Sequence, residues 1–131
     1  MERLTQRIAL ARAALQSFDE LAHKATRSKI ERDASIQRFE YTFEAVWKAV
    51  QHYAREVEGV DVGSPKQAAR VSLQVGLLDD TQTRAALVMV DDRNLTVHTY
   101  NEQLAEDIGR RLSAHATLLR VWLEQLSAGA A

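Results

Sequence analysis

Apolar residues recur every three or four positions along most of this chain, a spacing that places them on one face of an α-helix. In residues 2–24 they predict a first helix, and its stripe is Leu4, Ile8, Ala11, Leu15, Phe18 and Ala22. A more regular stripe predicts a second helix over residues 29–58, and it comprises Ile36, Phe39, Phe43, Val46, Val50, Tyr53 and Val57, with Trp47 beside it. Such regular spacing over three heptads is typical of helices that cross at about 20° in a four-helix bundle.

Turn and cap residues divide the middle of the chain. Residues 26–28 read as a short polar connection, and Gly59 ends the second helix before a loop over residues 60–63. Ser64 and Pro65 are suited to the cap and first position of a short helix that runs to about residue 75.

Gly76 stops this short helix, and the acidic pair Asp79-Asp80 begins the next one, which is expected to end at about Asp92. Thr99 and Glu102 have the spacing of a capping box, so a last helix is expected to start at residue 100. Its apolar stripe is Leu104, Ile108, Leu112, His115, Leu119, Trp122 and Leu126. Residues 129–131 are expected to fray.

These elements predict one all-α domain over residues 1–131, an antiparallel up-and-down four-helix bundle whose third helix is broken in two. The composition agrees, with 5 glycines, 1 proline and few aromatic residues. A net charge of −1 argues against wrapping DNA or docking on an anionic membrane. The absence of cysteine excludes disulfides and thiolate metal sites. No apolar run approaches the ~18 residues of a membrane span, and a cytoplasmic location is expected.

The most concentrated polar chemistry lies in residues 92–100, which we call the motif segment. Arg93, Asn94, His98 and Tyr100 occur there directly after six consecutive apolar residues, 85–90. The β-branched residues of the segment disfavour an uninterrupted helix. In a straight helix the Arg93 and His98 side chains would point about 140° apart. Either the backbone bends, or a second copy of the chain completes the site.

The other histidines have structural explanations. His23 suits the carbonyl end of the first helix, His52 lies half-exposed beside the second apolar stripe, and His115 lies on the last stripe as a hydrogen-bonded core residue. No pair of histidines lies three or four residues apart together with a carboxylate, so no metal site is expected. The Arg-x4-His spacing is weak evidence by itself, because Arg110 and His115 repeat it inside a regular helix. A purely structural role, with capping and hydrogen bonding across the bundle, remains an alternative for the motif segment.

The string from Arg93 to Tyr100 resembles the signature of the HEPN superfamily, which has an arginine, a polar residue, a short spacer and a histidine. The longer string DRNLTVHTYNE is similar to the branch called nucleotidyltransferase substrate-binding proteins, as are residues 32–40, Trp47-Lys48 and Ser64-Pro65-Lys66. One departure is that such relatives often carry a tryptophan two turns before the motif arginine, where this chain has Arg84-Ala85-Ala86.

The resemblance implies a helical bundle that forms a two-fold homodimer and acts with a minimal nucleotidyltransferase as a toxin–antitoxin pair. It implies a metal-independent endoribonuclease without cofactors, in which Arg93, His98 and Asn94 are catalytic and RNA is cut to 2′,3′-cyclic phosphate ends. It also implies that the antitoxin silences the toxin by attaching AMP to Tyr100. The alternative within the same family is a non-catalytic subunit that presents a substrate or nucleotide to the transferase.

Overall fold

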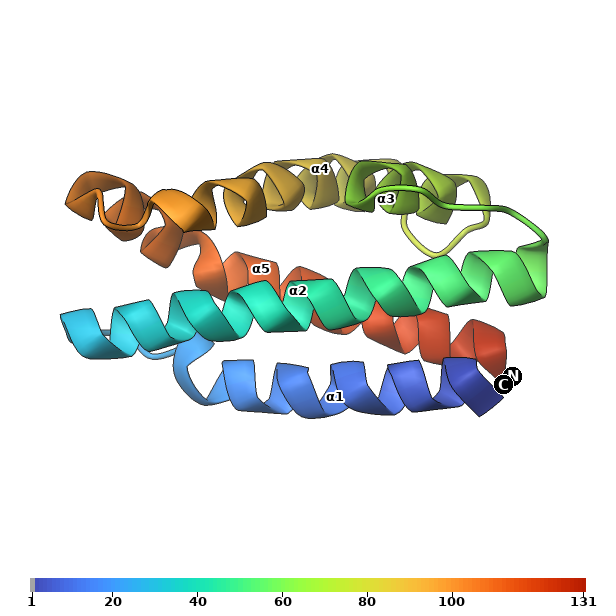
Figure 1. The fold of residues 1–131 in the computed structure, drawn as a ribbon, viewed down its shortest axis with the longest axis horizontal. Coiled ribbons are helices and arrows are strands. Elements are labelled where there is room, and N and C mark those ends of the chain that lie inside the picture. The colour runs from blue at the N-terminus through green and yellow to red at the C-terminus, as the bar shows by residue number, and fades with distance from the viewer. Residues whose placement is uncertain (1) are drawn as a thin grey trace.

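The computed structural model describes residues 2–131, which form five α-helices, one short 3₁₀ turn and no strand. The elements in chain order are α1 (Glu2–Ala22), α2 (Lys29–Glu58), α3 (Pro65–Gln74), α4 (Asp80–Leu95), the 3₁₀ turn η1 (Thr96–His98) and α5 (Glu102–Ala130). Figure 1 shows α1, α2 and α5 lying lengthwise together, with α3 and α4 along one side of them. The predicted all-α bundle with a broken third helix is therefore confirmed.

The predicted apolar stripes form the core between the helices. The largest side chains that are fully buried include Phe18 of α1, Phe39 and Phe43 of α2, and Trp122 of α5. The prediction was wrong for Val57, which is 39% exposed. Figure 1 shows the reason, because the last turns of α2 project beyond the ends of α1 and α5.

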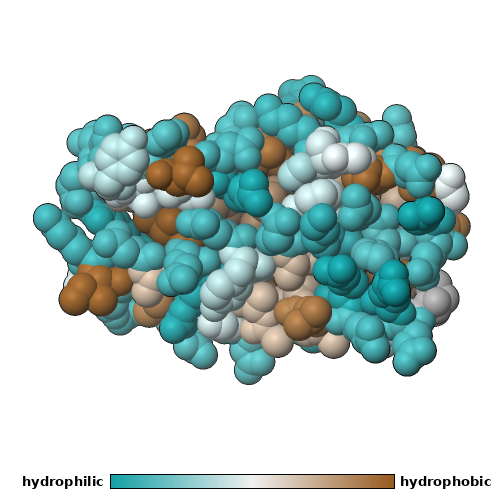
Figure 2. All heavy atoms as spheres, viewed as in Figure 1, coloured by the Kyte–Doolittle hydropathy of each residue, from teal (hydrophilic) through white to brown (hydrophobic). Residues whose placement is uncertain are grey.

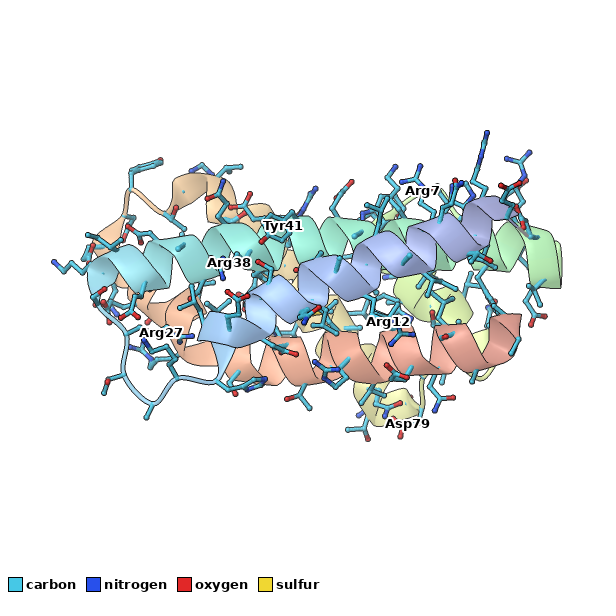
Figure 3. The ribbon with its side chains drawn as sticks, turned by 90° about the horizontal axis from the view of Figure 1, so that it is seen from below. Arg7, Arg12, Arg27, Arg38, Tyr41 and Asp79 are labelled. Carbon is cyan, nitrogen blue, oxygen red and sulfur yellow. The ribbon has the colours of Figure 1, made fainter. Side chains whose placement is uncertain are left out.

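The connection between α1 and α2 differs from its prediction in two respects. The first helix ends at Ala22, because Arg27 donates to the carbonyls of Leu21 and Ala22 at 3.1 and 3.2 Å and to the carbonyl of Gly109 on α5. Arg27 lies at this loop in Figure 3. His23 was expected to cap these carbonyls, but its Nδ1 instead lies 2.8 Å from the hydroxyl of Ser113. A guanidinium has enough donors to hold three carbonyls at once, whereas an imidazole has two at most.

The ends of α5 also differ from prediction. The helix begins at Glu102, and its cap is the side chain of Asn101, which accepts from the backbone N–H of Leu104 at 3.1 Å. The Thr99 hydroxyl does not cap the helix, because it donates to the carbonyl of Thr96 within the preceding turn. At the other end, α5 continues to Ala130 rather than fraying from Gly129, and a Cβ added at Gly129 would meet the hydroxyl of Tyr53. This close approach packs the last turn against α2.

The caps predicted for the broken third helix are confirmed. The Ser64 side chain accepts from the backbone of Gln67 at the start of α3, and the Asp79 side chain accepts from the backbone of Gln82 at the start of α4. The Trp122 indole donates to the buried hydroxyl of Ser72 at 2.9 Å, which ties α5 to α3. The caps fix where α3 and α4 begin, and the buried bond holds α3 against α5.

The outer surface is mostly polar. Figure 2 shows one face on which hydrophilic residues surround several small hydrophobic patches. No helix within residues 2–131 is both long and apolar enough to cross a membrane. In the same residues, no group of three or more histidine and acidic side chains is arranged to hold a metal ion.

Candidate functional site

A buried carboxylate fixes the start of the motif segment. Asp92 is 4% exposed, and its two oxygens accept from Arg111 Nε and Nη2, both at 2.7 Å, and from His115 Nε2 at 2.6 Å. Both partners lie on α5, so this cluster joins α4 to α5. The cluster explains why α4 continues to Leu95 rather than ending at Asp92, as the sequence predicted. Arg93 therefore lies in the last turn of α4.

The protonation states in this cluster follow from burial and hydrogen bonding. Burial by itself would raise the pKa of Asp92, but hydrogen bonds from Arg111 and His115 outweigh burial and hold that pKa below its usual 3.8. Burial lowers the pKa of His115 below 6.5, and the attraction of Asp92 only partly opposes this. The cluster is thus an ionised carboxylate, a charged guanidinium and a neutral imidazole that donates from Nε2 and stacks on Phe39 at 5.1 Å. The predicted structural role of His115 is confirmed.

We expect the protein to lose stability as the pH falls below about 6.5, the unperturbed value for His115. Because folding lowers the pKa of His115, the unfolded chain takes up a proton at a higher pH than the folded protein does. The contribution of neutral His115 to the free energy of unfolding is therefore fully present above pH 6.5. It is lost as the pH falls from 6.5 to the pKa of His115 in the folded protein. Each pH unit in this window costs at most about 1.4 kcal/mol. Urea unfolding at pH 7.5 and 5.5 measures the loss. Burial also lowers the pKa of His52, so comparing His115→Gln with His52→Gln separates the two histidines. If His115→Gln lost as much stability between pH 7.5 and 5.5 as wild type does, His115 would not be the cause of the loss.

Arg93 is oriented by a residue of α2. Its Nη2 donates to Glu44 at 2.8 Å, and the same Glu44 oxygen accepts from the indole of Trp47 at 3.0 Å. The guanidinium lies 6.0 Å from the Phe43 ring centre, and its Nη1 lies 3.5 Å from the Asn94 side-chain oxygen. One edge of the guanidinium is thus firmly held, while among residues 2–131 Nη1 makes only this long contact. The edge that carries Nη1 is suited to bind an anion.

His98 and Tyr100 form a second pair. The Nδ1 atom of His98 lies 3.1 Å from the hydroxyl of Tyr100, and the two rings meet edge to face with centres 5.8 Å apart. Both side chains are exposed, and Tyr100 is 84% exposed. The His98 imidazole keeps its Nε2 free of described partners, in contrast to His115 in the core.

The helix interruption predicted for the motif segment is present, since η1 replaces the α-helix over residues 96–98. This interruption does not unite the two pairs. Among residues 2–131, no hydrogen bond, ion pair or ring contact joins Arg93 or Asn94 to His98 or Tyr100. Arg93 and Asn94 instead line a groove of about 500 Å³ between α2 and the α4–η1 segment, which we call the α2–α4 groove.

The second Arg-x4-His match behaves as a structural feature. Arg110 pairs with Asp107 on the exposed side of α5, while His115 is committed to Asp92 in the core. The two matches therefore differ in the free imidazole, which only His98 offers. The sequence predicted the structural role of His115 but did not indicate Glu44, whose contact with Arg93 spans 49 residues.

Comparison with known proteins identifies the family of this chain. A protein from Thermus thermophilus with a solved structure is 56% identical, with a TM-score of 0.86 over 88% of this chain and 98% of that chain. The toxin–antitoxin MntA-HpeT, solved as a mutant, is 16% identical, with a TM-score of 0.79 over 98% of this chain and 99% of that chain, which shows a shared fold. No curated protein matches. The family described as nucleotidyltransferase substrate binding protein like matches residues 6–128. The chain therefore belongs to the nucleotidyltransferase substrate-binding-protein-like family, in agreement with the resemblance of its motif segment.

Proposed function

We propose that this protein is a HEPN-type, metal-independent endoribonuclease that works as a homodimer under the control of a partner nucleotidyltransferase. The observation that carries the proposal is the contrast between a buried and an exposed histidine. His115 is committed to the core, whereas His98 is exposed, has a free Nε2 and lies five residues from an arginine held by Glu44. An exposed imidazole and an oriented guanidinium are the groups that phosphodiester cleavage needs.

The reaction would use these groups in the following roles. His98 takes the proton from a ribose 2′-hydroxyl, and the resulting oxygen attacks the adjacent phosphorus. Arg93 binds the phosphate oxygens through its free edge and offsets the charge that builds on them, while Asn94 orients the phosphate. The bond to the 5′-oxygen breaks, and that oxygen leaves with a proton from a second, protonated imidazole. The products are a 2′,3′-cyclic phosphate and a 5′-hydroxyl.

The second imidazole is the reason for a dimer. Because Arg93 and His98 of one chain make no contact, a two-fold dimer offers a way for two such pairs to meet at one cleft. The surface around the motif segment supports this arrangement, since the apolar side chains of Leu95 and Val97 are 38 and 72% exposed. Large apolar side chains exposed beside a polar site are typical of an interface.

The decisive experiment is cleavage of RNA by the purified protein in EDTA, with the product ends identified by mass spectrometry. We expect 2′,3′-cyclic phosphate ends without added metal. The family description favours a second function, a non-catalytic subunit that presents substrate to a nucleotidyltransferase. A dimer that leaves RNA intact but binds nucleotide or the transferase would establish that second function and refute the nuclease.

The partner is proposed to silence the protein by transferring AMP to Tyr100. The toxin–antitoxin pair among proteins of the same fold supports such a partner, and the exposure of Tyr100 makes its hydroxyl accessible. We expect wild-type protein incubated with the transferase and ATP to gain the mass of one or more AMP groups, and Tyr100→Phe to gain none. Tyr53→Phe, which removes a buried hydroxyl, serves as the control and should be modified like wild type. AMP found on Tyr100→Phe would disprove the assignment.

A further inference from the structure

The α2–α4 groove contains polar groups that the proposed cleavage chemistry leaves unused. One side of the groove is formed by Gln37, Glu40, Tyr41 and Glu44, which recur on one face of α2. Arg93 is the point at which this face meets the motif segment, through its 2.8 Å contact with Glu44. The groove volume of about 500 Å³ falls in the range of sites for small organic groups.

Two of these side chains have no partner within the described part of the chain. Glu44 is occupied by Arg93 and Trp47, and the Tyr41 hydroxyl is occupied by Ser17 at 2.7 Å. Gln37 and Glu40 make no hydrogen bond or ion pair with any of residues 2–131. Figure 3 shows Tyr41 on α2 beside α1, and its side chain remains 42% exposed. The groove therefore offers a free amide, a free carboxylate and part of an aromatic ring.

The charges of the groove decide which part of an RNA it can take. Glu40 and Glu44 supply two negative charges and Arg93 supplies one positive charge, so the lining carries a net charge of −1. A phosphate would be repelled from Glu40 once it passed the free edge of Arg93. A nucleobase has no charge, and its ring N–H groups can donate to a carboxylate.

We propose that the α2–α4 groove binds a guanine base of the RNA next to the phosphate held by Arg93, an inference that rests on the proposed ribonuclease function. Glu40 accepts from guanine N1–H and N2–H together, and the Gln37 amide donates to guanine O6. The exposed part of the Tyr41 ring and the side chain of Val97 cover the faces of the base. Recognition of an unstacked base by its Watson–Crick edge and by an aromatic ring is typical of single-stranded RNA binding.

The choice of guanine follows from the donors on each base. A carboxylate binds best to two adjacent donors, as it does to an arginine fork. Guanine alone presents two adjacent N–H donors on its Watson–Crick edge, with an acceptor beside them for the amide. Adenine and cytosine each place an acceptor nitrogen beside a single amino group, and that nitrogen would face the second carboxylate oxygen. Uracil presents one donor between two acceptors.

The test uses short oligodeoxynucleotides that contain one ribonucleotide, so that only one bond can be cut. All four bases are placed in turn at the ribonucleotide and at the nucleotide that follows it, and kcat/KM is measured in EDTA. We expect guanine at one of these positions to be favoured over the other bases by roughly 10- to 100-fold. Glu40→Gln should reduce that ratio at least fivefold, whereas Asp61→Asn, which removes the same charge in the exposed loop after α2, should leave it unchanged.

Binding provides an independent measurement. Fluorescence anisotropy of the same oligonucleotides with His98→Ala should show the same guanine preference, and adding Glu40→Gln should remove it. Cleavage without base preference, a preference for another base, or a preference that persists in Glu40→Gln would overturn the guanine site but leave the nuclease intact. If no RNA is cut, the nuclease proposal fails, and equal binding of all these oligonucleotides would then refute the guanine site as well.

Discussion

Replacing His98 with alanine is expected to reduce metal-free RNA cleavage by a factor of roughly 10² to 10⁴, the usual contribution of a positioned acid–base group. The side chain is exposed, and its one hydrogen-bond partner in the described chain, Tyr100, is itself 84% exposed. The substitution should therefore leave the fold intact, which thermal melting can verify. Cleavage rates of wild type and variant in EDTA measure the effect.

The matched control is His52→Ala, which removes a half-exposed histidine at a distant part of α2. Its cleavage rate should stay within about twofold of wild type, because surface substitutions away from a site have small effects. Equal rates for His98→Ala and wild type would show that the exposed imidazole is not the base. Equal losses in both variants would point to a general effect of removing histidines, and would also disprove the specific role of His98.

Replacing Asp92 with alanine is expected to have the largest effect on stability, about 3 kcal/mol. The substitution leaves Arg111 and His115 without the carboxylate that accepts three hydrogen bonds from them. His115 is almost fully buried, but the Arg111 side chain is 43% exposed and can turn to water. This places the loss at the lower end of the values found for broken buried ion pairs.

Asp91→Ala is the natural comparison, because it removes the neighbouring carboxylate from the same turn of α4. Asp91 pairs with Lys66 at 2.9 Å on the surface, where the side chains of Asp91 and Lys66 are 61 and 43% exposed. Such pairs contribute about 1 kcal/mol or less. Urea unfolding should therefore separate the two variants clearly, and thermal melting should show a drop of roughly 10 °C for Asp92→Ala. Similar stabilities for the two variants would mean that the buried cluster does not hold α4 to α5.

The helices could be predicted from the sequence because the spacing of apolar residues and the cap residues that define each helix lie within or next to it. The apolar stripe of α2 runs at helical spacing for three heptads, and Gly59 follows it as a left-handed cap with φ of 67°. The start of α5 was less certain, because Thr99 and Asn101 are both good cap residues. Which one caps depends on η1, whose backbone takes the Thr99 hydroxyl and leaves Asn101 to cap α5.

The candidate site could be predicted only in part. Arg93 and His98 were identifiable because polar residues interrupt two well-patterned helices there. The contact of Glu44 with Arg93 could not be predicted from the residues next to Glu44, because it depends on how α2 and α4 are aligned lengthwise in the bundle. Asp92 was mistaken for a helix end for the same reason, because its partners Arg111 and His115 lie 19 and 23 residues later in α5.

The start of α1 and the end of α5 lie together at one end of the bundle, and the turn from α4 to α5 lies at the opposite end (Figure 1). Affinity tags or fluorescent labels can therefore be attached at either terminus without covering the motif segment. Two copies can also be joined by a long flexible linker as one polypeptide that carries a substitution in only one half. In such a fusion, removing His98 from one half alone should abolish cleavage, because the proposed cleft uses both imidazoles.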